Sequence, residues 1–261
     1  MAKFNEKLLL KKHVKNWWDN RQPRKNKKKQ YTTKGVPYKF EVTPPFYDVF
    51  KEIFIEDFYR IDDLISKIPA NAMIVDVGAN AGYFSFLILS KLKDAKVFAF
   101  EPMAVNVEQI TNNIALNKNL ELKLTFFPKA MTGDKTGPIE IFYDTQTNNP
   151  IIASVFEDFS SLNNQTKQVD AVSLHDFITG NNISRIDLLK LDCEGSEFPI
   201  LYDSPASVWE VIKGMTVEVH NLDDEKRNAE SLIMFLKTKG YVIEKHVAEN
   251  GCFSLNAFRS N

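Results

Sequence analysis

Cysteine is scarce in this sequence, with only Cys193 and Cys252 among 261 residues. Two isolated cysteines form neither a disulfide framework nor a C-x-x-C metal pair, which favours a reducing, cytoplasmic setting. No apolar run approaches the ~18 residues of a membrane span. The N-terminus also lacks the apolar core and small-residue cleavage site of a secretory signal. We therefore expect a soluble protein.

Three short motifs of common enzyme classes are also missing. Without G-x-x-x-x-G-K-S/T the sequence gives no support for a phosphate-loop enzyme, and without G-x-S-x-G it gives none for a nucleophile-elbow hydrolase. It also lacks the G-x-G-x-x-G of a typical dinucleotide site. These absences leave phosphate-loop and nucleophile-elbow enzymes without support and argue against a dinucleotide-dependent enzyme.

Positive charge is concentrated at one end of a chain whose net charge is only −1. Residues 1–39 hold 13 Lys or Arg against Glu6 and Asp19, a balance of +11; the remainder holds 20 basic and 32 acidic residues, a balance of −12. We interpret residues 1–39 as a basic, partly helical or mobile arm and residues 40–261 as one domain with its core at 72–258. Such an arm could contact an anionic membrane surface or RNA, although most charge runs are simply solvated.

A glycine turn follows residues 73–77, an apolar run that predicts a strand. Asp76, Gly78 and Gly82 form the pattern D-x-G-x-x-x-G, and an apolar, helix-like segment begins at residue 84. A strand, a tight glycine turn and a helix start are the usual means by which an α/β protein presents backbone N–H groups to a ligand. Because the G-x-G-x-x-G spacing is absent, we expect a nucleoside-type cofactor without a pyrophosphate.

The second predicted strand, residues 96–100, ends at Glu101 and Pro102. A carboxylate at this point can accept both hydroxyl groups of a ribose. The alternative is an acid that the helix dipole favours near a helix N-terminus, and the nearby glycine turn favours the ribose. The loop at 130–134 follows a third strand, and Met131 in it is a candidate border for an adenine ring.

Acidic residues gather after a later strand, residues 186–191, whose apolar run is interrupted by Lys190 and is typical of a buried parallel strand. Three carboxylates follow within six residues: Asp192, Glu194 and Glu197. Strand alternation places Lys190 on the same face as Asp192, so we expect these two side chains to pair.

A further strand, residues 215–220, carries Glu218 and His220 on one face. A helix at about 226–239 and two strands around Asn250-Gly251, a strong hairpin signal, complete the chain. The pattern predicts an α/β fold with a doubly wound, seven-stranded, mostly parallel, Rossmann-like sheet and an antiparallel C-terminal hairpin. Since ligands gather at the carboxyl ends of such strands, all the unusual residues are expected at one edge.

These blocks, in this order and spacing, resemble the FkbM family of S-adenosylmethionine-dependent methyltransferases over about residues 72–245. The resemblance is carried by four stretches: Asp76–Ser85, Phe100–Pro102, Asp187–Glu197 and Glu218–His220. The D-x-E-G-x-E pattern that begins at Asp192 is the most specific of them, and Cys193 departs from the aliphatic residue usual at its position. The resemblance implies a class I methyltransferase fold with S-adenosylmethionine as cofactor, and it does not cover the basic arm.

The resemblance also implies a set of cofactor-binding residues at the turn, the second strand end and the acidic edge. In this sequence they are Asp76, Gly78, Ala79, Asn80, Gly82, Tyr83, Glu101, Pro102, Met131 and Asp192. The turn would cradle the methionine part of the cofactor, Glu101 would hold the ribose, and Asp192 would lie beside the sulfonium and the acceptor.

Methyl transfer to a hydroxyl needs alignment of the reactants and removal of a proton. We assign the base to His220, because an unperturbed imidazole pKa of about 6.5 suits neutral pH, with Asp192, Glu194 or Glu197 orienting it or taking the proton. The alternative for His220 is a histidine satisfied by a backbone carbonyl. The crowded carboxylates could also share a proton or bind a divalent metal, which is the less favoured interpretation.

The predicted function is therefore O-methylation of a hydroxyl on a sugar, glycan, lipid or metabolite. Two other functions compete with it. One is an NAD-dependent oxidoreductase, against which the altered glycine spacing and the missing second nucleotide-binding half argue. The other is a non-catalytic binding module recruited by residues 1–39, against which the intact cofactor residues argue.

Overall fold

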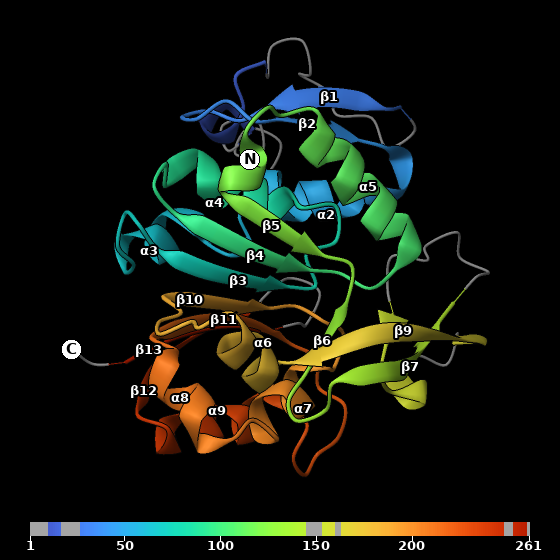
Figure 1. Ribbon diagram of the computed structural model, residues 1–261, viewed down its shortest axis with the longest axis vertical. Helices are drawn as coiled ribbons and strands as arrows, with labels where there is room; N and C mark the ends of the chain where they lie inside the picture. The colour runs from blue at the N-terminus through green and yellow to red at the C-terminus, as the bar shows by residue number, and fades with distance from the viewer. Residues whose placement is uncertain (1–9, 17–26, 145–152, 160–162, 248–252, 260–261) are drawn as a thin grey trace.

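The computed structural model describes residues 10–16, 27–144, 153–159, 163–247 and 253–259. At its centre lies a seven-stranded sheet in the order β12-β13-β11-β10-β3-β4-β5 (Figure 1). The strands are β3 (Met73–Val77), β4 (Lys96–Phe100), β5 (Leu124–Phe127), β10 (Leu188–Leu191), β11 (Gly214–Val219), β12 (Tyr241–Val247) and β13 (Phe253–Arg259).

The five strands from β5 to β11 run parallel, and β13 runs antiparallel to both β11 and β12. The predicted doubly wound sheet with an antiparallel C-terminal pair is therefore confirmed. The Asn250-Gly251 turn that we expected between the last two strands lies outside the described residues. The strand order reverses between β3 and β10, which makes the carboxyl ends of these two strands the expected ligand position.

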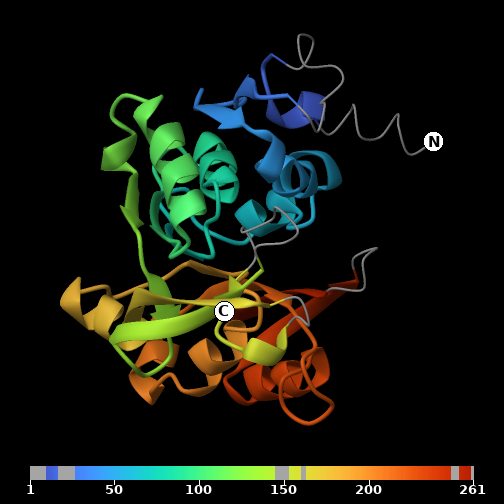
Figure 2. The ribbon, with the colours of Figure 1, turned by 90° about the vertical axis from the view of Figure 1, so that its right-hand side faces the viewer.

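Helices cover both faces of the sheet, as Figures 1 and 2 show. One face carries α2 (Tyr47–Lys51), the π-helix η2 (Glu52–Glu56), α3 (Ile61–Ser66), α4 (Tyr83–Lys91) and α5 (Ala104–Ala115). The other carries α6 (Leu174–Gly180), α7 (Glu197–Tyr202), α8 (Ala206–Val211) and α9 (Ala229–Thr238). Short 3-10 turns lie at η1 (Pro44–Phe46), η3 (Leu120–Leu122) and η4 (Glu157–Phe159). No helix in the described ranges is long and apolar enough to cross a membrane.

Two hydrophobic clusters fill the space between the sheet and these helices. Strand alternation sends Ile74 and Leu188 into the first cluster and Val75 and Leu189 into the second. Helix α4 is buried along nearly its whole length, since the sheet packs on one side and the N-terminal segment covers the other. The apolar, helix-like segment expected from residue 84 is therefore a helix that is buried on both sides.

The N-terminal segment packs against the domain where it is described. Strand β1 (Lys29–Thr32) pairs antiparallel with β2 (Lys39–Val42), and Val14 bridges to Thr33. Lys12 forms an ion pair with Asp62 at 2.7 Å, which uses one basic charge of the segment within the protein. The predicted boundary at residue 39 falls at this strand pair, and the division of the chain into arm and domain stays a prediction.

A second, four-stranded sheet lies at the side toward which β3, β4 and β5 point (Figure 1). It contains β6 (Ala130–Thr132), β7 (Gly137–Tyr143), β8 (Ala153–Ser154) and β9 (Gln165–Ser173), in the order β6-β9-β7-β8. The loop expected at 130–134 is wrong in its first half, because buried Ala130 and Met131 pair with β9 as a strand.

Candidate active site

The glycine turn after β3 has the shape that its sequence predicted. Gly78 has φ +74° and Gly82 has φ +82°, a backbone region that glycine enters without steric cost. A Cβ on Gly78 would also overlap the backbone carbonyl oxygen of Asp192. Position 78 therefore requires glycine for two reasons: the positive φ angle, and the direct packing of the turn on the end of β10.

The backbone N–H groups of this turn are engaged within the protein. Those of Gly78 and Ala79 donate to the carbonyl oxygen of Phe100 at 3.0 and 2.9 Å, and that of Asn80 donates to Glu101 Oε2 at 2.9 Å. Ala81 N donates to Asn80 Oδ1 at 2.8 Å. We expected N–H groups free to face a ligand, so this expectation is wrong: the turn shapes the site by its path and by the residues it holds.

Glu101 is buried at the end of β4, with 4% of its surface exposed. Its Oε2 accepts the Asn80 N–H and its Oε1 accepts the Met103 N–H, both at 2.9 Å. Burial raises the pKa of Glu101 to about 7, although these backbone hydrogen bonds act to lower it. Half-buried Pro102 follows at the strand end, and buried Met131 lies in the same hydrophobic cluster as Phe100.

Two residues of the implied cofactor set are turned into the core. Tyr83 is 1% exposed, packs among aromatic rings such as Phe40, and donates its hydroxyl hydrogen to the Glu41 carbonyl at 2.8 Å. Asp76 is fully buried, and its Oδ2 accepts the Ser85 hydroxyl at 2.6 Å. The side chains of Tyr83 and Asp76 therefore stabilise the turn from within the protein core.

Lys190 links the turn to the acidic edge. Its Nζ donates to the Gly78 carbonyl at 2.8 Å and lies 3.3 Å from both Asp76 Oδ1 and Asp192 Oδ2, so the predicted Lys190–Asp192 pair is confirmed. Burial alone would lower the pKa of Lys190, but the carboxylates of Asp192 and Asp76 outweigh it and raise that pKa. The Tyr59 hydroxyl donates to Asp192 Oδ2 at 2.6 Å.

The loop after β10 brings the predicted acidic residues together. Glu194 adopts φ +53°, an uncommon conformation for a residue with a side chain. Glu197 is fully buried: its Oε2 accepts the Gly195 N–H at 2.8 Å, and its Oε1 accepts the His220 N–H at 3.0 Å. Glu197 thus joins the loop to the end of β11 and has no oxygen left over for a substrate.

His220 is held between carboxylates. Its Nδ1 lies 3.2 Å from Glu197 Oε1, and its Nε2 lies 3.2 Å from Glu194 Oε2 and 3.9 Å from Glu218 Oε1. Burial lowers the pKa of His220, but the hydrogen bond and charge of Glu197, together with the charges of Glu194 and Glu218, raise it to about 10. We assigned His220 as the base because an ordinary imidazole has a pKa of about 6.5, and in this structure the pKa of His220 lies well above that value.

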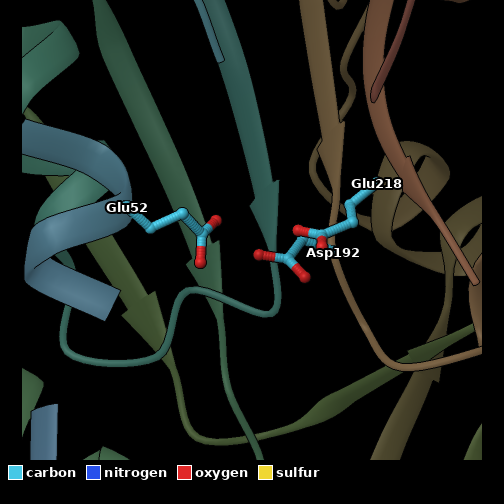
Figure 3. A group of neighbouring side chains, drawn as sticks. All are labelled: Glu52, Asp192 and Glu218. Carbon is cyan, nitrogen blue, oxygen red and sulfur yellow. The ribbon is translucent and has the colours of Figure 1, made fainter. Parts of the chain in front are cut away.

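Three carboxylates converge at the switch point (Figure 3). One oxygen each from Glu52, Asp192 and Glu218 lie within 4.8 Å of one another. Glu52 comes from η2, on the face opposite to α7, and sequence reasoning missed it. No motif or spacing connects residue 52 with residues 192 and 218; only the fold brings them together.

The segment β8–η4 covers the acidic edge. The Ser154 hydroxyl donates to the Glu194 carbonyl at 2.6 Å, and the ring of Phe159 lies 5.4 Å from that of His220. The Arg227 guanidinium stacks over the ring of Phe156, with its central carbon 4.7 Å from the ring centroid. The side chains that border the acidic edge on this side are therefore largely aromatic.

The sheet order and the carboxylates at its switch point define a Rossmann-like α/β protein whose site lies at the strand carboxyl ends. The chain belongs to the FkbM methyltransferase family, since the model of the methyltransferase FkbM domain matches residues 76–243.

Three curated relatives agree with this assignment. Methyltransferase sdnD of Sordaria araneosa is 30% identical over 77% of this chain and 84% of its own length. Methyltransferase 1 of Beauveria bassiana is 28% identical over 75% of this chain and 80% of its own length. The 31-O-demethyl-FK506 methyltransferase FkbM of Streptomyces tacrolimicus is 26% identical over 67% and 75%, respectively. The chain is therefore a methyltransferase.

Proposed function

We propose that this methyltransferase transfers the methyl group of S-adenosylmethionine to a hydroxyl oxygen of a small-molecule or glycan acceptor. The observation that supports the proposal is the direct packing of the Gly78 turn on the Asp192 backbone, with Glu101 on one side and the acidic edge on the other. A nucleoside-type donor and an acceptor can then meet at one point. The name of the Streptomyces relative, which specifies a 31-O-demethyl substrate, supports oxygen as the acceptor atom.

The residues on the turn side fit such a donor. Glu101 offers a carboxylate fixed by two backbone N–H groups and by the Asn106 side chain, at the strand end where such an acid would accept a ribose hydroxyl. The bends at Gly78 and Gly82 would border the methionine part of the cofactor, and Met131 would border the adenine. When bound, the cofactor supplies an electrophilic methyl group on a sulfonium.

The residues on the acidic side would position the acceptor and receive its proton. For the acceptor oxygen to take up the methyl group that the cofactor would supply, its hydroxyl proton must leave. The raised pKa keeps His220 protonated at neutral pH, so Glu194, 3.2 Å from its Nε2, is the proposed acceptor of the proton, and His220, held by Glu197, orients Glu194. Tyr59 fixes Asp192 beside them.

Binding of S-adenosylhomocysteine, compared with NAD, tests the cofactor assignment. We expect isothermal titration to give saturable binding of S-adenosylhomocysteine and none of NAD; binding of NAD alone would instead favour the oxidoreductase. Incubation of the protein with labelled S-adenosylmethionine and a cell extract should then yield a labelled product that is a methyl ether.

A separate experiment tests the proton route. His220→Ala should lower kcat by about 10²-fold or more while the Kd of S-adenosylhomocysteine stays within about threefold. A near wild-type rate at saturating acceptor would remove His220 from the mechanism. His175→Ala provides the matched control, because His175 is a half-buried histidine on α6 that pairs only with its neighbour Asp176 among the described residues.

A further inference from the structure

The three converging carboxylates have oxygens that no donor satisfies. Among the described residues, the Glu52 side chain has no hydrogen bond or ion pair, and Glu218 has only the 3.9 Å contact with His220. Both donors to Asp192, the Tyr59 hydroxyl and the Lys190 ammonium, act on Oδ2. The other oxygen of Asp192 has no donor among the described residues.

Such an arrangement is unfavourable without a positive charge inside it. Negative charges less than 5 Å apart in a partly desolvated site repel one another by several kcal/mol, and this repulsion drives either proton sharing or cation binding. Lys190 compensates only part of this charge, because its Nζ is shared between Asp192 Oδ2 and Asp76 Oδ1, each 3.3 Å away. Only 8% of the surface of Glu218 is exposed, so water does little to stabilise its negative charge.

A buried hydroxyl lies on the same face of the sheet as Glu218. Ser254 lies directly across from Glu218 in the β11–β13 pair, and side chains at directly opposite positions share a face of the sheet, with their Cβ atoms about 5 Å apart. Ser254 is 2% exposed, and its hydroxyl oxygen has no hydrogen-bond partner in the described part of the chain. A buried hydroxyl without a partner beside unsatisfied carboxylates indicates that something polar completes the site.

We propose that Glu52, Asp192 and Glu218 bind a divalent cation, with Ser254 completing its surroundings directly or through water. Because every available group is an oxygen, the cation belongs to the hard class of Mg²⁺, Mn²⁺ or Ca²⁺. Figure 3 shows the three side chains pointing toward one another from η2, the end of β10 and β11. The binding site itself does not depend on the methyl-transfer proposal.

The position of the cation suggests its use, and this step rests on the proposed function. Asp192 lies where the acceptor would meet the donor, so a cation on this carboxylate would also contact the acceptor hydroxyl. A bound hydroxyl loses its proton more easily, since the cation stabilises the negative oxygen. The cation would thus activate the acceptor, and Glu194, oriented by His220, would receive the proton.

Manganese binding to the chelator-treated full chain tests the site. Mn²⁺ is measured by electron paramagnetic resonance, followed by competition with Mg²⁺ and Ca²⁺. We expect one Mn²⁺ per chain, displaced by Mg²⁺ or Ca²⁺. Glu52→Gln should weaken Mn²⁺ binding by roughly 10-fold or more, the size of loss usual when a metal site is damaged. Glu218→Gln should do the same and provides a second variant if the first does not fold.

Glu56→Gln is the matched control, because Glu56 lies on the same π-helix but is exposed and paired with Lys51. Its Mn²⁺ affinity should equal that of the wild type. The proposal is overturned if no Mn²⁺ binds at millimolar free metal, or if Glu52→Gln and Glu56→Gln bind it equally. Titration of S-adenosylhomocysteine on the same samples separates the two proposals: cofactor binding without Mn²⁺ binding refutes the cation site alone, and the reverse refutes the cofactor alone.

Discussion

Replacement of Glu101 by Gln should change both the affinity for S-adenosylhomocysteine and its dependence on pH. Glu101 is buried, and its pKa is raised from an ordinary value of 4.5 to about 7. If ribose hydroxyls donate to this carboxylate, the cofactor binds its ionised form. Below pH 7 the free protein must then lose a proton before it binds, so affinity should fall as the pH falls.

The size of the effect follows from this pKa. At pH 6 about nine-tenths of Glu101 carries its proton in the free protein, and at pH 8 about one-tenth does, so the Kd should be roughly 10-fold higher at pH 6. The same shift affects stability with a definite sign. Between pH 4.5 and 7 the folded state keeps a proton that the unfolded state has lost, so raising the pH through this window removes about 3 kcal/mol of stability from the free protein.

Isothermal titration from pH 6 to pH 8, in buffers of different ionisation enthalpy, measures both the affinity and the protons released. Glu101→Gln should bind S-adenosylhomocysteine roughly 10–100-fold more weakly at pH 8, because each hydrogen bond to a charged acceptor contributes about 1.5–3 kcal/mol. Its affinity should also lose most of the pH dependence. Glu108→Gln, an exposed substitution on α5, should behave as the wild type.

Two results would refute this reasoning. The first is a wild-type Kd that is constant between pH 6 and pH 8. The second is a Glu101→Gln variant that keeps the full pH dependence, which would move the titration to another group, such as Glu194, whose pKa burial raises to about 7.

Three further outcomes can be checked by unfolding measurements. Lys190→Met should destabilise the protein by about 3–5 kcal/mol in urea, since it leaves the Asp76 and Asp192 charges uncompensated; a loss below 1 kcal/mol would contradict the network. Gly78→Ala should lower Tm strongly or prevent folding because of the overlap with the Asp192 carbonyl, whereas Gly180→Ala, with open space around it, should leave Tm nearly unchanged; equal effects would contradict the packing. Deletion of residues 1–36 removes β1 with its buried Tyr31 and should lower Tm by roughly 10 °C or more; an unchanged Tm would mean that the segment contributes nothing to the fold.

Much of the central sheet could be predicted because its strands are short apolar runs with clear breaks. The position of the site could be predicted as well, since parallel strands must end at one edge, and this rule alone brought Glu101 and Asp192 together. Alternation along residues 188–191 sufficed for the Lys190–Asp192 pair. These conclusions depend on local pattern and on topology, which a sequence carries directly.

Properties that depend on three-dimensional neighbours could not be predicted. Glu52 reaches the site from a π-helix, and no spacing relates it to Asp192. The pKa of His220 follows from carboxylates that surround it in the fold, so its ordinary value was a poor guide. Met131 lies in a strand and not in a loop because a partner strand some 40 residues later, β9, is available to pair with it.

The contact between Gly78 and the Asp192 carbonyl has a mechanical consequence. The loop after β3 and the loop after β10 contact each other through backbone atoms, and no side chain lies between them at this point. A shift of one loop therefore requires a matching shift of the other. The span from donor to acceptor is therefore set by main-chain atoms, and substrate preference can vary through the surrounding side chains while that span stays constant.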